Sequence, residues 1–253
     1  MNNIRREQMR EYIEKNKIVT IEELSQLMPD VSLMTIHRDL TYLQEQGHIE
    51  KVRGGARCTV DYSHEGAFFA REILNKGAKQ ALAAKAVPLI AGSRSIFLDA
   101  GTTMMAFAGM LPDTFANIVT TGPNIALELS KKANLTINLC GGTLNKSNLT
   151  LSGPAALESV SKLNIDTAFL VAAGYSAHCG FTCGKESEAR IKIQVVAQAR
   201  KTIMLMDTSK IERMLSHTFA GMEDFSTIVT EKDPKDLPAD FLAAAEQAGA
   251  VVL

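Results

Sequence analysis

The spacing of apolar residues in the first quarter of the chain predicts three short helices. In the third, Ile36, Leu40 and Leu43 recur at i, i+4 and i+7, which places them on one buried stripe. Two helices are expected before it, over residues 4–16 and 20–28, because Thr20 and Glu23 have the spacing of a capping box at the start of the second.

The third helix is expected to present a polar face that suits a nucleic-acid partner. Ser32 is a good N-cap for it, and Gly47 is the expected left-handed cap at its end. Its remaining candidate DNA-facing residues are Met34, Thr35, His37, Arg38 and Thr41. A helix with hydroxyls, Arg and His on its exposed half can lie in the major groove, where Arg contacts guanine.

A basic hairpin is predicted directly after this helix. Residues 48–53 alternate as a strand does, and Gly54-Gly55 permits a tight reversal. Lys51, Arg53 and Arg57 would then place cations near phosphates. This order of parts is typical of a winged helix-turn-helix that binds double-stranded DNA. The pattern alone also fits a module that merely packs or dimerises.

The rest of the chain predicts an α/β domain with a mostly parallel sheet over residues 76–253. Seven short apolar runs, many separated by helical patterns, carry this prediction. They cover residues 95–99, 117–120, 135–140, 167–172, 202–206, 227–230 and 250–253. Residues 58–75 lack strand alternation, so they are expected to link this domain to a DNA-binding domain over residues 1–57.

Small and hydroxyl-bearing residues follow several of these runs, at the carboxyl ends where open α/β sheets bind ligands. Asp99 is expected to bind sugar hydroxyls, and Lys210 to pair with phosphate or a carbonyl. Helix N-termini expose backbone N–H groups to anions. The candidate anion-binding loops and their neighbours contain Gly101, Thr102, Thr103, Thr120, Thr121, Gly122, Gly142 and Gly174. Any one loop could be an ordinary turn; together they predict a pocket.

Composition excludes few classes of function. The chain has 253 residues, a net charge of −1 and 46% hydrophobic residues, which is typical of a soluble protein with one or two domains. Residues 1–60 contain as many Asp and Glu as Lys and Arg, so a positive surface must come from arrangement. We expect no signal peptide, no membrane span and reduced cysteines, hence a cytoplasmic protein.

Both halves closely resemble the DeoR-type family of bacterial transcription regulators. The first half carries the run from Val31 to Leu40, then Gly47 and the run from Val52 to Ala56, similar to the family's recognition helix and wing. The second half resembles the family's effector domain, which shares its fold with ribose-5-phosphate isomerases. Its matching positions are Lys79, Leu98, Asp99, Gly101, Thr102, Thr103, Val119, Thr120, Asn124, Gly141, Gly142, Gly153, Asp166, Gly174, Glu188, Lys192, Asp207, Ser209 and Lys210.

The resemblance implies a repressor of a carbohydrate operon that a phosphorylated sugar or related metabolite releases from operator DNA. It adds Glu188 and Lys192 to the effector-binding residues. It also implies a homo-oligomer, since helix-turn-helix proteins usually bind paired half-sites. The chain departs from the family pattern at five places: Pro29-Asp30 lengthens the turn, and His37, Thr121, Asn145 and Val171 replace the usual residues. The effector therefore cannot be carried over from the family.

Two other hypotheses stay open at this point. Asp166, Glu188, Lys192 and Lys210 are residue types that a sugar-phosphate isomerase could use. A DNA-binding module argues for a sensor instead, and fold likeness does not establish function. His178, Cys179 and Cys183 lack the spacing of a closed metal site, so we expect neither a metal nor a cofactor.

Overall fold

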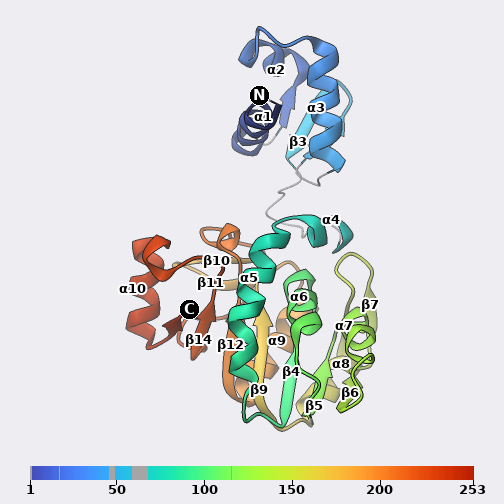
Figure 1. The fold of residues 1–253 in the computed structure, drawn as a ribbon, viewed down its shortest axis with the longest axis vertical. Helices are drawn as coiled ribbons and strands as arrows, with labels where there is room; N and C mark the ends of the chain where they lie inside the picture. Colours follow the sequence, from blue (N-terminus) through green and yellow to red (C-terminus); the bar gives the residue numbers. More distant parts are fainter. Residues whose placement is uncertain (1, 17, 46–48, 59–67, 115) are drawn as a thin grey trace. The chain divides into compact units, whose positions relative to one another are not determined.

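The structure, a computed structural model, describes residues 2–16, 18–45, 49–58, 68–114 and 116–253. Contacts between residues divide the chain into two units, Met1–Leu74 and Asn75–Leu253 (Figure 1). The predicted helix cap at Gly47 and half of the predicted linker, residues 59–67, lie outside the described residues. The predicted domain borders stay a prediction.

The N-terminal unit contains the predicted three helices and hairpin. Its elements are α1 (Asn2–Asn16), β1 (Ile18–Thr20), α2 (Ile21–Leu27), α3 (Leu33–Glu45), β2 (Ile49–Val52), β3 (Gly55–Cys58) and α4 (Phe68–Ile73). The three strands form an antiparallel sheet in the order β1-β3-β2. The capping box at Thr20 and Glu23 is present, with the Glu23 N–H donating to Thr20 Oγ1 at 3.1 Å.

A seven-stranded parallel sheet forms the centre of the C-terminal unit, and each of its strands coincides with one predicted apolar run. The strand order is β15-β14-β12-β9-β4-β5-β6. The strands are β4 (Ser95–Leu98), β5 (Ala116–Thr120), β6 (Leu135–Leu139), β9 (Ile165–Val171), β12 (Ala199–Leu205), β14 (Thr227–Val229) and β15 (Val251–Val252). The α/β prediction with a mostly parallel sheet is confirmed.

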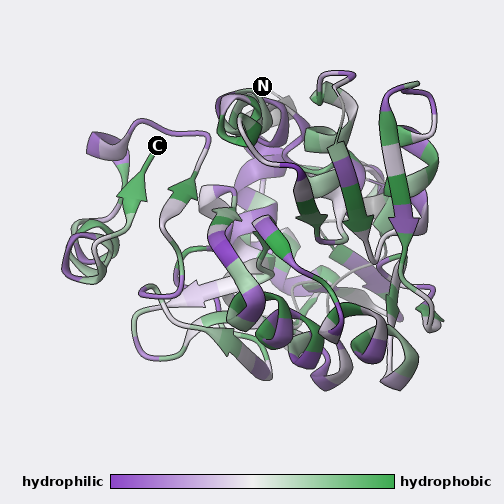
Figure 2. Ribbon diagram, turned by 90° about the horizontal axis from the view of Figure 1, so that it is seen from below, coloured by the Kyte–Doolittle hydropathy of each residue, from purple (hydrophilic) through white to green (hydrophobic). Residues whose placement is uncertain are grey.

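Helices cover both faces of this sheet. Those of the unit are α5 (Lys76–Ala86), α6 (Thr102–Met110), α7 (Pro123–Leu129), α8 (Pro154–Ser161), α9 (Glu186–Gln198) and α10 (Ala239–Ala248). Ile96 and Leu98 of β4 pack in one core with α5, α6 and α7, whereas Phe97 packs in a second core with α8, α9 and α10. Hydrophobic and hydrophilic bands alternate along the helices in Figure 2, as expected of amphipathic helices.

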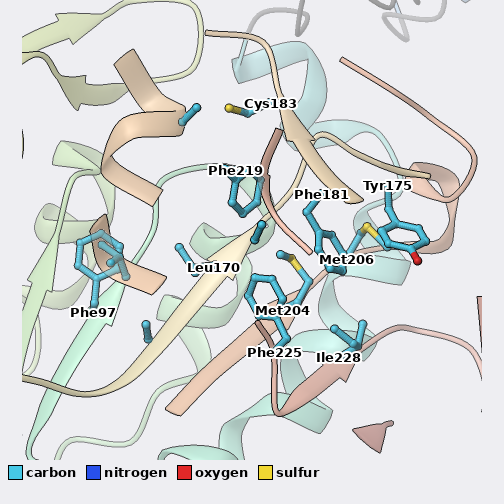
Figure 3. Packing of buried hydrophobic residues seen from close by; sticks show 14 of the residues in the cluster. Phe97, Leu170, Tyr175, Phe181, Cys183, Met204, Met206, Phe219, Phe225 and Ile228 are labelled. Atoms are coloured by element: carbon cyan, nitrogen blue, oxygen red, sulfur yellow. The ribbon is translucent and has the colours of Figure 1, made fainter. Parts of the chain in front are cut away.

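Two smaller pieces of sheet were not predicted. The strands β10 (Gly174–Ser176), β11 (Gly180–Cys183) and β13 (His217–Ala220) form an antiparallel sheet, and β7 (Thr143–Asn145) pairs with β8 (Thr150–Ser152). Aromatic rings pack against the first: the ring centroid of Phe181 lies 4.8 Å from that of Tyr175 and 4.9 Å from that of Phe225 (Figure 3). Such short strands show no periodicity in the sequence.

Across the part of the chain that the structure describes, no helix combines the length and the apolar character needed to cross a bilayer.

Candidate functional sites

The helix α3 has the buried side and the exposed side that the sequence predicts. Ile36, Leu40 and Leu43 are buried, whereas Met34, His37 and Arg38 are exposed. Ser32 precedes the helix, and its Oγ accepts a hydrogen bond of 3.3 Å from the Thr35 N–H and lies 3.0 Å from Thr35 Oγ1. The N-terminal half of α3 therefore offers a fixed outward face.

One charged residue of α3 points inward, and the sequence interpretation missed it. Asp39 is buried, and its carboxylate accepts hydrogen bonds from Arg5 Nε at 2.6 Å and Arg6 Nε at 2.7 Å. The Arg6 guanidinium also lies 3.8 Å from the centroid of the Tyr42 ring. Asp39 follows Ile36 by three positions, so helical periodicity could have placed it on the buried side. These contacts join α1 to α3.

We expect Asp39→Asn to lower the free energy of unfolding by about 2–3 kcal/mol at pH 7, because charged hydrogen bonds are lost. Burial alone would raise the pKa of Asp39, but the hydrogen bonds and charges of Arg5 and Arg6 lower it. The stabilisation is therefore complete above the unfolded value of about 3.9 and is lost as the pH falls through the folded value. Urea unfolding of both proteins at pH 7 and pH 2.5 checks this; an equal difference at both pH values would contradict it.

The wing is tied to α3 by side chains. The Lys51 N–H donates to Gln44 Oε1 at 2.8 Å, and Lys51 Nζ donates to Thr41 Oγ1 at 3.0 Å. Thr41 Oγ1 in turn donates to the His37 carbonyl at 2.9 Å. Two predicted DNA-facing residues, Thr41 and Lys51, thus bond to each other, and this contact joins the β2 strand of the wing to the helix.

The two glycines of the wing have different roles. Arg53 and Gly54 form the two-residue loop of the hairpin, and Gly54 has a φ of +83°. Gly55 already belongs to β3, where a Cβ atom would lie 2.0 Å from the Val19 carbonyl oxygen of β1. The close approach of two strands, rather than the turn, requires glycine at this position.

In the C-terminal unit, the strand order reverses beside β4. The chain moves from β4 through β5 to β6 on one side and later adds β9, β12, β14 and β15 on the other. Ligands of open α/β sheets bind outside the carboxyl ends of the strands at such a switch point. Asp99 directly follows β4, and Val171 ends β9. Both therefore lie at the switch point.

Asp99 and Lys192 form a buried ion pair there. Lys192 Nζ donates to Asp99 Oδ2 and, at 2.9 Å, to the Val171 carbonyl. The Asp99 carboxylate also accepts the N–H groups of Ala100 at 2.8 Å and Val171 at 3.0 Å. Burial alone would lower the pKa of Lys192, but the Asp99 charge, with smaller contributions from Cys183 and Glu188, raises it. Lys192 is thus a fixed cation.

The predicted phosphate cradle begins α6 beside this pair. Gly101 caps the helix with a φ of +134°, a conformation that side chains disfavour, and Thr102 and Thr103 of the first turn are buried. Thr120 ends the neighbouring strand β5, Thr121 follows it, and both are also buried. The sequence-predicted loops after β4 and β5 therefore lie at the ends of adjacent strands.

Glu188 extends this polar region one helical turn from Lys192. It is buried at the start of α9, and its Oε1 accepts hydrogen bonds from Asn145 Nδ2 at 2.9 Å and Asn148 Nδ2 at 2.8 Å. The sequence interpretation noted Asn145 only as a departure from the family pattern and missed Asn148. Both lie in the β7–β8 hairpin, whose Leu151 N–H donates to the Thr121 carbonyl at 2.8 Å.

The remaining candidates lie along the same edge of the sheet. Gly142 follows β6 at the start of the β7–β8 hairpin, and Gly174 begins β10 shortly after β9. Gly122 caps α7, and its N–H donates to Thr120 Oγ1 at 3.0 Å. Lys210 follows β12 in a short 3-10 helix, Thr208–Lys210, capped by Asp207.

Asp166 does not join this group. It lies near the amino end of β9, where its Oδ2 accepts the N–H groups of Ser95 at 3.0 Å and Arg94 at 3.1 Å. These two backbone hydrogen bonds lower the pKa of Asp166. Asp166, which was considered with Glu188, Lys192 and Lys210 as a residue type that an isomerase could use, therefore lies apart from the other three, because the amino and carboxyl ends of parallel strands lie at opposite edges of the sheet.

The cysteines occupy separate environments. Cys183 is buried in β11, Cys179 Sγ lies 3.1 Å from Met214 Sδ, and burial raises the pKa of the Cys140 thiol to about 11. Among the described residues, no group of three or more His, Cys, Asp or Glu side chains could hold a metal ion.

Comparison with known proteins identifies matches to both units. Residues 5–60 match the model of the DeoR-like helix-turn-helix domain, and residues 74–232 match that of the DeoR C terminal sensor domain. The HTH-type transcriptional regulator GlpR of Haloferax volcanii is 34% identical over 92% of this chain and 90% of its own. The HTH-type transcriptional repressor GlcR of Bacillus subtilis is 29% identical over 92% of this chain and 89% of its own.

Among solved structures, ribose 5-phosphate isomerase A from Methanocaldococcus jannaschii matches 55% of this chain and 56% of its own. The TM-score is 0.40 and the sequence identity 18%, a likeness too weak to bear on function.

Proposed function

The chain belongs to the DeoR family of transcriptional regulators, and from this premise we propose that it is a cytoplasmic repressor of a carbohydrate operon. A phosphorylated sugar-like effector bound by the C-terminal unit would release it from operator DNA. The name of the relative GlcR, a transcriptional repressor, supports repression. Ser32, Thr35, His37 and Arg38 would face the major groove, and Arg53 the neighbouring backbone.

The observation that carries the effector proposal is the buried Asp99–Lys192 pair at the switch point of the sheet. Keeping a buried charge costs free energy unless its surroundings compensate. Here Asp99 holds Lys192 beside the first turn of α6, where Thr102 and Thr103 begin the helix. A cation next to a helix N-terminus favours an anionic ligand group. We infer that the effector phosphate binds at this turn.

The other charged groups of this edge would orient the rest of the effector. Lys210 would pair with phosphate or a carbonyl, and Glu188 would accept sugar hydroxyls. The sequence led us to expect that Asp99 binds sugar hydroxyls. In the structure its oxygens already accept hydrogen bonds from two N–H groups and the Lys192 ammonium. We therefore propose that Asp99 positions Lys192 and the α6 loop, and leaves the hydroxyls of the sugar to Glu188.

Catalysis is not part of this proposal. An isomerase needs a carboxylate that moves a proton between carbons. The carboxylate of Asp99 is occupied by Lys192 and two N–H groups, and Asp166 lies at the opposite edge of the sheet. The family relationship also favours a regulator.

Effector binding would act by a population shift between arrangements of the chain that differ in operator affinity. We propose at least a dimer, because paired half-sites require two copies of α3.

The test is thermal stabilisation of the full chain by a panel of phosphorylated sugars, sugar alcohols and sugar acids. A ligand at 100 to 1,000 times its dissociation constant should stabilise the protein by about 3–4 kcal/mol. The identified ligand should then release the protein from operator DNA. Absence of stabilisation by every member of the panel would contradict a sugar-phosphate effector.

The double variant Thr102→Ala/Lys210→Ala should stay on the operator when this ligand is added, because it loses groups that bind the phosphate. Thr136→Ala in β6 and Lys162→Ala after α8, both exposed in the native protein, are the matched controls and should release normally. Normal release by the double variant, followed in an operator-binding titration, would exclude the proposed phosphate site.

A further inference from the structure

Met34 has the most exposed large hydrophobic side chain among the described residues, with 74% of its surface open to solvent. It lies in the first turn of α3, and helical geometry directs it away from the buried Ile36 and Leu40. Arg38 follows four positions later on the same outward face. Such an exposed thioether suits an apolar contact with a partner.

The side chains around Met34 indicate what kind of partner this face can bind. Thr35 Oγ1 already lies 3.0 Å from Ser32 Oγ, and Thr41 Oγ1 donates to the His37 carbonyl. Arg38 is exposed, and its side chain makes no hydrogen bond or ion pair with any residue that the structure describes. The centre of the outward face thus pairs an available cation with an apolar group, and the wing cation Arg53 is also exposed in this unit. This charge suits a polyanion.

The apolar group that bases present in the major groove is the C5-methyl of thymine. We propose that Met34 contacts the C5-methyl of one thymine in each operator half-site, next to the base contacted by Arg38. Residues at i and i+4 have Cβ atoms about 6 Å apart, and successive bases are about 3.4 Å apart. The thymine should therefore lie within about two base pairs of that base. This inference rests on the proposed binding of α3 in the major groove.

Replacing single thymines of the operator by deoxyuridine tests the contact, because deoxyuridine lacks only the methyl group. An operator is first selected from random duplex DNA with the full wild-type chain. Each half-site should contain one thymine whose single replacement by deoxyuridine weakens wild-type binding about fourfold, because the complex then buries one methyl group less. The Met34→Ala protein should bind the two duplexes equally. Circular dichroism should show that it is folded as the wild type is.

Leu33, 54% exposed beside Met34, provides the matched control. Leu33→Ala should keep the fourfold sensitivity to deoxyuridine; if it loses the sensitivity while Met34→Ala keeps it, the assignment to Met34 is overturned. Equal binding of the wild type to every substituted duplex would also overturn it. A wild-type chain that selects no duplex would overturn the proposed DNA binding itself, which separates the two failures.

Discussion

Replacing Lys192 with methionine is expected to destabilise the C-terminal unit by about 3–5 kcal/mol. The variant leaves the Asp99 carboxylate buried without its cation, and breaking a buried ion pair from one side costs about this much. Far-UV circular dichroism during urea unfolding of the full chain measures the effect, since the sequence contains no tryptophan.

Two further variants separate the charge effect from lost packing. Asp99→Asn/Lys192→Met removes both charges and should recover a large part of the lost stability. Lys162→Met breaks an exposed pair with Glu158 in α8 and should leave the free energy of unfolding almost unchanged. A similar loss in Lys162→Met and Lys192→Met would show that burial of the pair does not matter.

Arg38→Ala is expected to weaken operator binding by about 30-fold or more. A bidentate arginine–guanine contact contributes about 1–3 kcal/mol, and the proposed dimer on two half-sites would lose it twice. The variant should stay folded, because Arg38 is exposed and contributes nothing to the buried stripe of α3. Fluorescence anisotropy with labelled operator, at one fixed salt concentration, measures the loss.

The comparison variant is Arg57→Ala. Arg57 is exposed in the same unit, but its guanidinium already pairs with Glu50 at 2.6 Å. Its removal should weaken binding by less than tenfold at any operator sequence. If Arg57→Ala weakens binding as much as Arg38→Ala, α3 has no special role in base recognition.

The sequence predicted the elements of this protein better than the partners of its polar residues. All seven strands of the parallel sheet were predicted, because a buried strand is a continuous apolar run. The pairing of Asp99 with Lys192 was not, because no local pattern connects residues 93 positions apart. The hydrogen bond between Lys51 and Thr41 was also missed, because no local pattern connects a strand residue with a helix residue even at this shorter separation. Periodicity gives the direction of a side chain but not the group that it meets.

The order of the strands also determines when each function arises during synthesis. The α3 helix and the wing are complete once residue 58 has folded, whereas β4 acquires its buried cation only when Lys192 has left the ribosome. At about 5–20 residues per second, these events are on the order of ten seconds apart. On the proposed function, a growing chain would present its DNA-binding surface before it could sense any effector. Because paired half-sites need a second copy, assembly would keep these early chains from occupying operators that no metabolite could yet clear.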